Sequence, residues 1–130
     1  MKYLIFLLLA GCSNNLPIYK ERIANICIEH NCRREAWIRR YTVEFDIMNN
    51  GVAATCGNNE ILIDIKYWHE LDELEKEALL MHEYGHCVFG KDDIHDVTQI
   101  DIMVQRFRFM KEKYRKHREY MLEKFFGDLI

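Results

Sequence analysis

The sequence has no excess of charge of one sign and no apolar run long enough to span a membrane. Its formal net charge is −3 at pH 7 over 130 residues, so we expect neither nucleic acid as a partner nor a strongly basic surface. The apolar run over residues 3–9 is too short to cross a bilayer as a helix. The residues after this N-terminal segment are sufficient for one small domain.

The N-terminal segment resembles a bacterial lipoprotein signal peptide. Lys2 supplies a positive charge, residues 3–9 supply the apolar core, and Leu-Ala-Gly-Cys at 9–12 resembles a lipoprotein cleavage box. This resemblance implies a signal peptide over 1–11, a lipidated Cys12 and a tether over 12–18. Ser13 favours the outer membrane, so we expect a lipid-anchored protein of the bacterial cell envelope that faces the periplasm. An ordinary secretory signal or a buried N-terminal strand is the alternative.

The first half of the chain predicts a small sheet. Residues 42–47 alternate apolar and polar side chains, which is the pattern of a half-buried strand. The turn signal Asn-Asn-Gly at 49–51 makes residues 52–55 a candidate return strand, and Gly-Asn-Asn at 57–59 leads into the strongest strand candidate, 60–65. We therefore predict an α+β fold with a short, mostly antiparallel sheet of about three strands.

Helices are expected over three segments, namely 19–40 with an interruption near Asn31-Cys32, 72–89, and 104–126. Asp72 is a candidate N-cap with Glu75 three residues later, as in a capping box, and Gly90 can end the helix in the left-handed conformation. The final helix has an apolar stripe that we expect in the core, formed by Phe107, Met110, Tyr114, His117 and Met121. His117 is expected to be structural, and the basic face of this helix is expected to be solvated.

The second helical segment contains His82-Glu83-Tyr84-Gly85-His86, an H-E-x-x-H pattern. Histidines four residues apart lie one turn apart on the same helical face, so both imidazoles can bind one metal ion. Glu83 adjoins the first histidine and can act as a base beside the metal. A catalytic zinc site has three protein ligands as a rule. Asp93 and His95, which come after the predicted end of this helix, are both chemically adequate as the third.

Four cysteines besides Cys12 form an even set, which suits an exported protein with disulfides. Four cysteines allow three pairings. We favour Cys27–Cys32 as a local link and Cys56–Cys87 as a link between a strand or turn and the H-E-x-x-H helix. A metal-ligand role for Cys87 is less favoured, because adjacent helical residues point about 100° apart.

The segment 77–103, centred on Met-His-Glu-Tyr-Gly-His-Cys at 81–87, resembles zincin metallopeptidases of the metzincin type. It is especially similar to small bacterial and phage metallopeptidases with an H-E-L-G-H-C segment, and residues 61–68 resemble their preceding strand. The resemblance covers about residues 41–103. It does not include the final helix. With that predicted C-terminal helix, we expect a single zincin-like domain over 19–130 that contains the active-site helix.

The resemblance also implies the site residues. His82 and His86 would bind zinc, Glu83 would be catalytic, and Ile102-Met103 would form a methionine turn in which Met103 supplies an apolar floor. Metzincins have glycine three residues after the second histidine, but here Phe89 occupies that position. Gly90 comes one residue later, which shifts the third ligand to Asp93, where similar small proteins have histidine. His95 is the second candidate, and Asp92 is the third.

The function implied is zinc-dependent hydrolysis of peptide bonds in the cell envelope, with a peptide or protein as substrate. Residues 61–65 are expected either to offer an open strand edge to an extended peptide or to pack only in the core. One alternative is a non-catalytic envelope lipoprotein that binds a protein partner and keeps a structural or degenerate metal site. Another is a plain helical domain with His82 and His86 on its surface.

Overall fold

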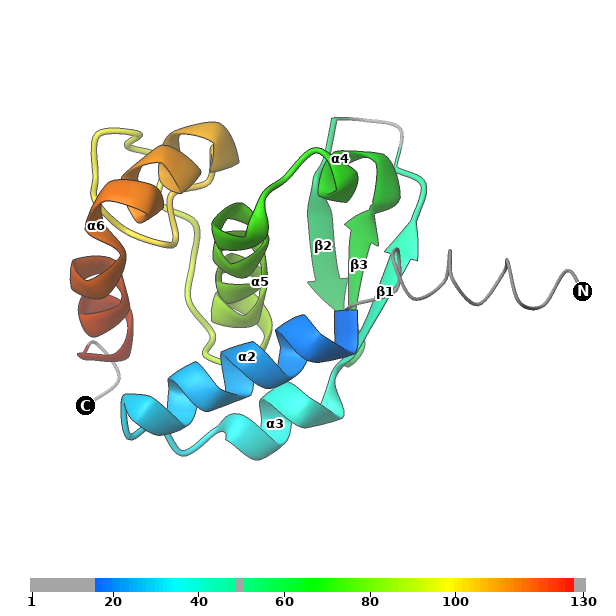
Figure 1. The fold of residues 1–130 in the computed structure, drawn as a ribbon, viewed down its shortest axis with the longest axis horizontal. Coiled ribbons are helices and arrows are strands. Elements are labelled where there is room, and N and C mark those ends of the chain that lie inside the picture. The colour runs from blue at the N-terminus through cyan, green and yellow to red at the C-terminus, as the bar shows by residue number, and fades with distance from the viewer. Residues whose placement is uncertain (1–15, 49–50, 128–130) are drawn as a thin grey trace, which may run out of the picture.

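The computed structural model describes residues 16–48 and 51–127, which form an α+β domain (Figure 1). Within these residues there are five helices, α2 (Leu16–Glu29), α3 (Glu35–Arg40), α4 (Ile65–His69), α5 (Glu73–Cys87) and α6 (Phe107–Gly127), and three strands, β1 (Thr42–Asp46), β2 (Ala54–Gly57) and β3 (Glu60–Asp64). The predicted signal peptide, Cys12 and Ser13 lie outside the described residues. Among the helices described, none has the length and apolar character needed to cross a membrane.

The α+β class is confirmed, and the sheet has the order β1-β3-β2. β2 returns antiparallel to β3 across a two-residue hairpin in which Asn58 and Asn59 have φ of 53° and 63°. Two successive positive φ angles are typical of the type I′ turn that suits a tight hairpin. β1 instead runs parallel to β3, so the expected return strand pairs with β3 and not with β1. β3 takes the centre because Ile61 and Ile63 are fully buried there.

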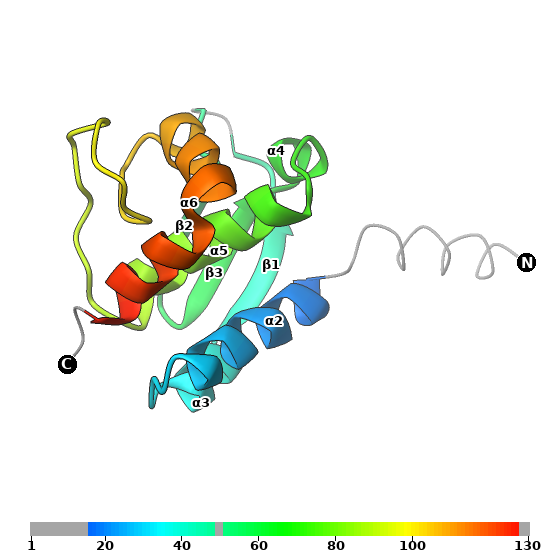
Figure 2. The same cartoon turned by 60° about the vertical axis from the view of Figure 1, so that its left-hand side comes forward.

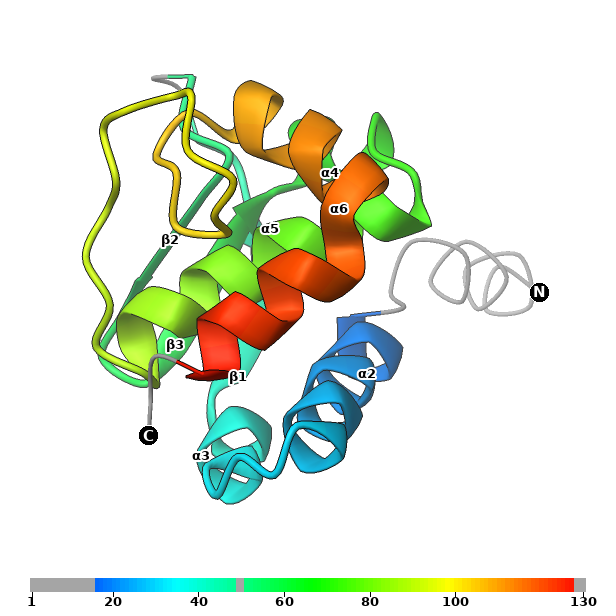
Figure 3. The same ribbon diagram turned by 90° about the vertical axis from the view of Figure 1, so that its left-hand side faces the viewer.

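Helix α5 lies between the sheet and helix α6 (Figures 1 and 2). It contacts β2 on one side and α2 and α6 on the others, and Figure 3 shows α6 crossing in front of it. The largest fully buried side chains come from all of these layers, and they are Trp68, Tyr84, Tyr114, Ile23, Ile38, Ile61, Ile63, Leu80, Met81, Ile102, Met110 and Met121. The H-E-x-x-H segment therefore lies on the central helix of the domain.

Both ends of α5 are fixed by side chains. The predicted capping box is present, since the Asp72 carboxylate accepts from the Glu75 N–H and the Glu75 carboxylate accepts from the Asp72 N–H, both at 2.9 Å. The helix ends at Cys87, two residues before the predicted end, and Gly90 adopts the predicted positive φ of 66°. Arg34 donates to the Val88 carbonyl at 2.7 Å, which satisfies an acceptor that the helix leaves unpaired.

The start of α2 and the end of the strand before α4 differ from the sequence expectation. Helix α2 begins at Leu16, which is buried, so residues 16–18 of the expected tether are helical; Pro17 fits the first turn because it needs no N–H acceptor there. The strand-like segment 61–68 ends at Asp64 and continues as α4. Helix α4 places Trp68 in the core, where its ring packs edge-on against the Tyr19 ring with 5.3 Å between the ring centroids.

Helix α6 contains a break that the apolar stripe does not predict. It begins at Phe107, three residues later than expected, and His117 has non-helical angles of φ −132° and ψ 32°. Met110, Tyr114 and Met121 are buried as expected, but His117 is not among the buried residues. The expectation that His117 belongs to the core stripe is therefore wrong, because the break turns this residue towards solvent.

The two favoured disulfides are both present. Cys27–Cys32 closes a loop of five residues at the end of α2, and Cys56–Cys87 joins β2 to the last residue of α5 across 31 residues. Cys87 is thus held by Cys56 and does not face the two histidines as a ligand. The second disulfide links the edge of the sheet to the central helix.

Loop-closure entropy predicts different costs for removing the two disulfides. The Cys56→Ser/Cys87→Ser variant should lose about 3.7 kcal/mol of the free energy of unfolding, and the Cys27→Ser/Cys32→Ser variant about 2 kcal/mol, because the longer loop restricts the unfolded chain more. Urea denaturation of both variants and the parent protein measures this. Equal losses, or a larger loss for the Cys27–Cys32 pair, would contradict the expectation.

Candidate metal centre

The two histidines of the motif are held in one orientation by backbone carbonyls. His82 Nδ1 donates to the carbonyl of Ile102 at 2.7 Å, and His86 Nδ1 donates to the carbonyl of Lys91 at 2.8 Å. A carbonyl can only accept, so each neutral ring carries its proton on Nδ1 and keeps the lone pair on Nε2. This is the arrangement in which metal-binding histidines are found in proteins.

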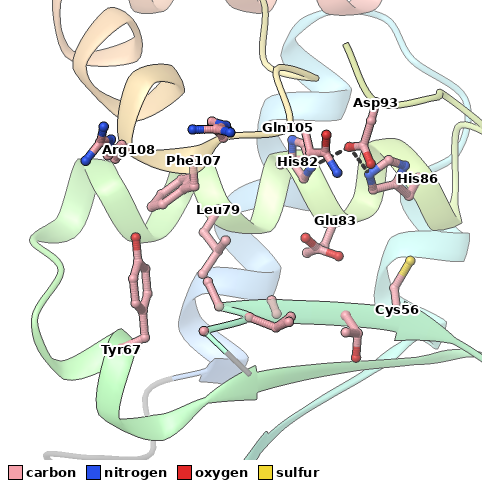
Figure 4. Close-up of a pocket in the computed structure, with 16 residues that line it drawn as sticks. Cys56, Tyr67, Leu79, His82, Glu83, His86, Asp93, Gln105, Phe107 and Arg108 are labelled. Atoms are coloured by element: carbon pink, nitrogen blue, oxygen red, sulfur yellow. Dashed lines mark hydrogen bonds and ion pairs between the residues drawn. The ribbon is translucent and has the colours of Figure 1, made fainter. Parts of the chain in front are cut away.

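Asp93 completes a group of three ligand atoms. Its Oδ1 lies 2.8 Å from His86 Nε2 and 3.3 Å from His82 Nε2, and the ligand atoms of the three residues lie within 4.8 Å of one another. Figure 4 shows the three side chains converging from α5 and from the segment after it. The sequence prediction that names Asp93 therefore corresponds to the residue found beside the two histidines.

The electrostatics of this group favour a bound cation. Two imidazole lone pairs and a carboxylate oxygen face one another, and like partial charges at such distances repel. Burial also lowers the pKa of His82, which disfavours a proton on that ring, although the hydrogen bond to Ile102 acts in the opposite direction. Ligands of a tetrahedral zinc ion at its usual bond lengths lie about 3.3 Å apart. The 3.3 Å spacing between Asp93 Oδ1 and His82 Nε2 fits an ion of this kind, whereas the 2.8 Å spacing to His86 Nε2 is that of a hydrogen bond, which a bound ion would replace.

The other candidate ligands lie elsewhere. His95 is exposed, and its Nδ1 bonds the Gln105 side-chain oxygen at 2.7 Å. The metal-ligand group found within the described residues contains neither His95 nor Asp92. Asp93 reaches the histidines because the chain turns at Gly90 and the Lys91 N–H then donates to the Gly85 carbonyl at 2.8 Å.

The segment after Asp93 returns to α5 and supports the site. The Ile94 N–H donates to the Met103 carbonyl at 2.8 Å, and the Gln105 N–H donates to the Ile94 carbonyl at 2.9 Å. Met103, the residue of the predicted methionine turn, packs against Gly85, where an added Cβ would meet its sulfur. Glycine at 85 thus allows this close approach, and the neighbouring Ile102 carbonyl contacts His82.

Glu83 has the environment of a base in a dry site. Only 7 % of its surface is exposed, and its carboxylate accepts no hydrogen bond from the residues that the structure describes. Burial raises the pKa of Glu83 from 4.5 to about 7, and the nearby His86 limits the rise. In Figure 4 the carboxylate points away from the three ligand side chains towards β2. Glu83 can therefore receive a proton near neutral pH.

A cleft of about 720 Å³ opens beside this group, a volume typical of ligand-binding pockets. Strand β2 forms one wall, α5 the base, and residues 105–108 at the start of α6 the other wall. The strand beside the cleft is the edge strand β2. The expectation of an open edge at 61–65 is wrong because β3 pairs on both sides, and the alternative of core packing is confirmed.

The far end of the cleft was not predicted from the sequence. Tyr67, Phe107 and Arg108 line it, Arg106 also lines the cleft, and no motif marks these residues. The only available signal was the basic character of the segment that begins at Arg106. Their arrangement depends on how α4 and α6 pack, which a local pattern does not report.

Comparison with protein-family models, curated proteins and solved structures finds no significant match to this chain. The resemblance to metzincins thus stays a prediction from the residues of the motif. A functional proposal for this protein therefore depends on the geometry of His82, Glu83, His86 and Asp93 and of the cleft beside them.

The metal centre predicts one bound zinc ion per chain and a ligand set that excludes His95. Asp93→Ala, His82→Ala and His86→Ala should each weaken zinc affinity more than about 100-fold, since losing even a hydrogen-bonding partner of a ligand costs about 10- to 100-fold. Asp92→Ala and His95→Ala are matched controls and should bind zinc as the parent does. Competition titration with a chelating dye measures the affinities. Full affinity in Asp93→Ala with loss in His95→Ala would contradict this ligand set.

The pKa of Glu83 predicts a pH-dependent stability of the metal-free protein. Between pH 4.5 and 7 the folded protein keeps a proton that the unfolded chain has released, so the free energy of unfolding falls as pH rises, by up to about 3 kcal/mol. The Glu83→Gln variant should lack this pH-dependent part of the free energy of unfolding. The Glu112→Gln variant, changed at an exposed position of α6, should keep it. Urea denaturation from pH 4 to pH 8 measures the difference. Parallel curves for the parent and Glu83→Gln would refute it.

Proposed function

We propose that this protein is a zinc-dependent metallopeptidase. One observation carries the proposal: two imidazoles with their Nδ1 atoms fixed by carbonyls present Nε2 towards the Asp93 carboxylate, beside a buried glutamate in a cleft. Two histidines and a carboxylate are a ligand set of catalytic zinc, which leaves one position for substrate or water. When bound, the ion supplies Lewis-acid polarisation of a carbonyl group.

The residues of this chain supply the remaining parts of the reaction. His82, His86 and Asp93 hold the ion, and the carbonyls of Ile102 and Lys91 keep the two rings in the required tautomer. Glu83 would take a proton from the attacking water and pass it to the departing amine nitrogen, a role that suits a buried carboxylate in the cleft beside the two histidines. The low exposure of Glu83 keeps bulk water from competing for that proton.

The edge of β2 is the surface that suits an extended peptide. β2 pairs with β3 on one side only and lines the cleft on the other. A peptide that adds to this edge would form main-chain hydrogen bonds and lie alongside Glu83. We propose the peptide backbone as the substrate for this reason, since strand addition recognises the main chain of any sequence.

We propose the oxidising cell envelope as the place of action. Two disulfides within one small domain support an exported protein. The lipid anchor at Cys12 belongs to the same proposal and depends on the N-terminal sequence pattern alone.

The catalytic role of Glu83 predicts a variant that binds metal but does not turn over. Zinc-loaded Glu83→Gln should retain one ion per chain and lose about 10²- to 10⁴-fold in kcat on a quenched fluorescent peptide library. Glu112→Gln is the matched control and should cleave as the parent does. Unimpaired cleavage by Glu83→Gln would contradict the mechanism. If the zinc-loaded parent protein cleaves no peptide, the proposed peptidase activity is wrong, and a non-catalytic binding protein is favoured.

A further inference from the structure

The cleft has a basic end opposite the metal site. Arg108 lies at that end, and Arg106 also lines the cleft. Both arginines are exposed, and within the described chain neither forms an ion pair with an acidic residue; the Arg108 guanidinium lies over the Phe109 ring, 4.8 Å from its centroid. Guanidinium groups with no acidic partner beside a cleft are suited to bind a carboxylate of a ligand, because their planar donors match its two oxygens.

Nearby groups do not cancel this positive charge. Glu75 is the acidic residue with the largest electrostatic effect on Tyr67, but its carboxylate is already paired with Lys111 at 3.2 Å. The first turn of α6, where Arg108 lies, contains no acidic residue, and the start of a helix adds further positive potential. The Tyr67 hydroxyl lies at the same end of the cleft and can donate to an anion.

An apolar section in the middle of the cleft separates the metal site from the basic end. Leu79 and Phe107 form an apolar section, and Figure 4 shows Arg108 and Tyr67 beyond Leu79 as seen from Glu83. Leu79 precedes Glu83 by four residues of α5, a rise of about 6 Å. Two residues of an extended peptide span about 6.6 Å. A peptide bond held at Glu83 therefore places a group two or more residues away next to the arginines.

We propose that Arg106 and Arg108 are specificity residues which bind a carboxylate of the peptide, either an acidic side chain or a free C-terminus, two or more residues from the bond at Glu83. This inference rests on the proposed function, because it names the substrate class of the same cleft. The basic end of the cleft attracts such a carboxylate, which places that part of the peptide beside Arg108.

Binding to the zinc-loaded Glu83→Gln protein tests this without requiring turnover. Three peptides of otherwise identical sequence are compared by calorimetry: one with Glu and an amidated C-terminus, one with Gln and an amidated C-terminus, and one with Gln and a free C-terminus. At low salt, at least one carboxylate-bearing peptide should bind about two- to fivefold tighter than the amidated Gln peptide. The preference should shrink in 0.5 M salt (roughly a 4 Å screening length).

Charge reversal identifies the residues responsible. Adding Arg106→Glu and Arg108→Glu should abolish or invert the preference, whereas Arg33→Glu, the same change at a position outside the cleft, should keep it. Equal affinities for the three peptides, no measurable binding of any of them, or an equal effect of Arg33→Glu would each overturn the proposal. A clear preference in this assay with no cleavage by the zinc-loaded parent would instead overturn only the proposed peptidase activity.

Discussion

The site depends on two hydrogen bonds from imidazole rings to carbonyls outside the helix. The motif places His82 and His86 on one face of α5, but a bare helix leaves each ring free to rotate and to exchange its tautomer. The carbonyls of Lys91 and Ile102 remove that freedom. Since both carbonyls belong to the segment between α5 and α6, the arrangement of that segment decides whether the two histidines act as a metal-binding pair.

That segment is held from several directions. The bridge between Ile94 and Val104 closes it into a loop, and Met103 fixes it against Gly85 of the helix. The Asp101 carboxylate accepts from the Met103 N–H at 2.8 Å and pairs with Lys124 of α6 at 3.3 Å. These polar contacts thus connect the C-terminal helix to the carbonyl that orients His82. Contacts outside the H-E-x-x-H motif therefore hold the segment between α5 and α6 in the position that orients the two histidines.

Sequence patterns predicted the features that depend on neighbouring residues. The capping box at Asp72, the positive φ at Gly90, the turn before β3 and the position of Asp93 all depend on spacings of a few residues. The features that depend on distant segments could not be obtained in this way. Three such features are the parallel pairing of β1 with β3, the break at His117 and the basic end of the cleft. They result from tertiary packing, which selects one of several backbone arrangements that the local sequence allows equally well.

The Cys56–Cys87 disulfide joins one wall of the cleft to its base, because Cys56 belongs to the edge strand and Cys87 to the end of the central helix. The other wall, at the start of α6, has no covalent link to either of them among the residues described. It is held instead by ion pairs, in which Lys111 and Arg115 of α6 contact Glu75 and Asp72 at the start of α5. One side of the cleft is therefore fixed by a covalent bond that salt does not affect, and the other by charges that salt screens.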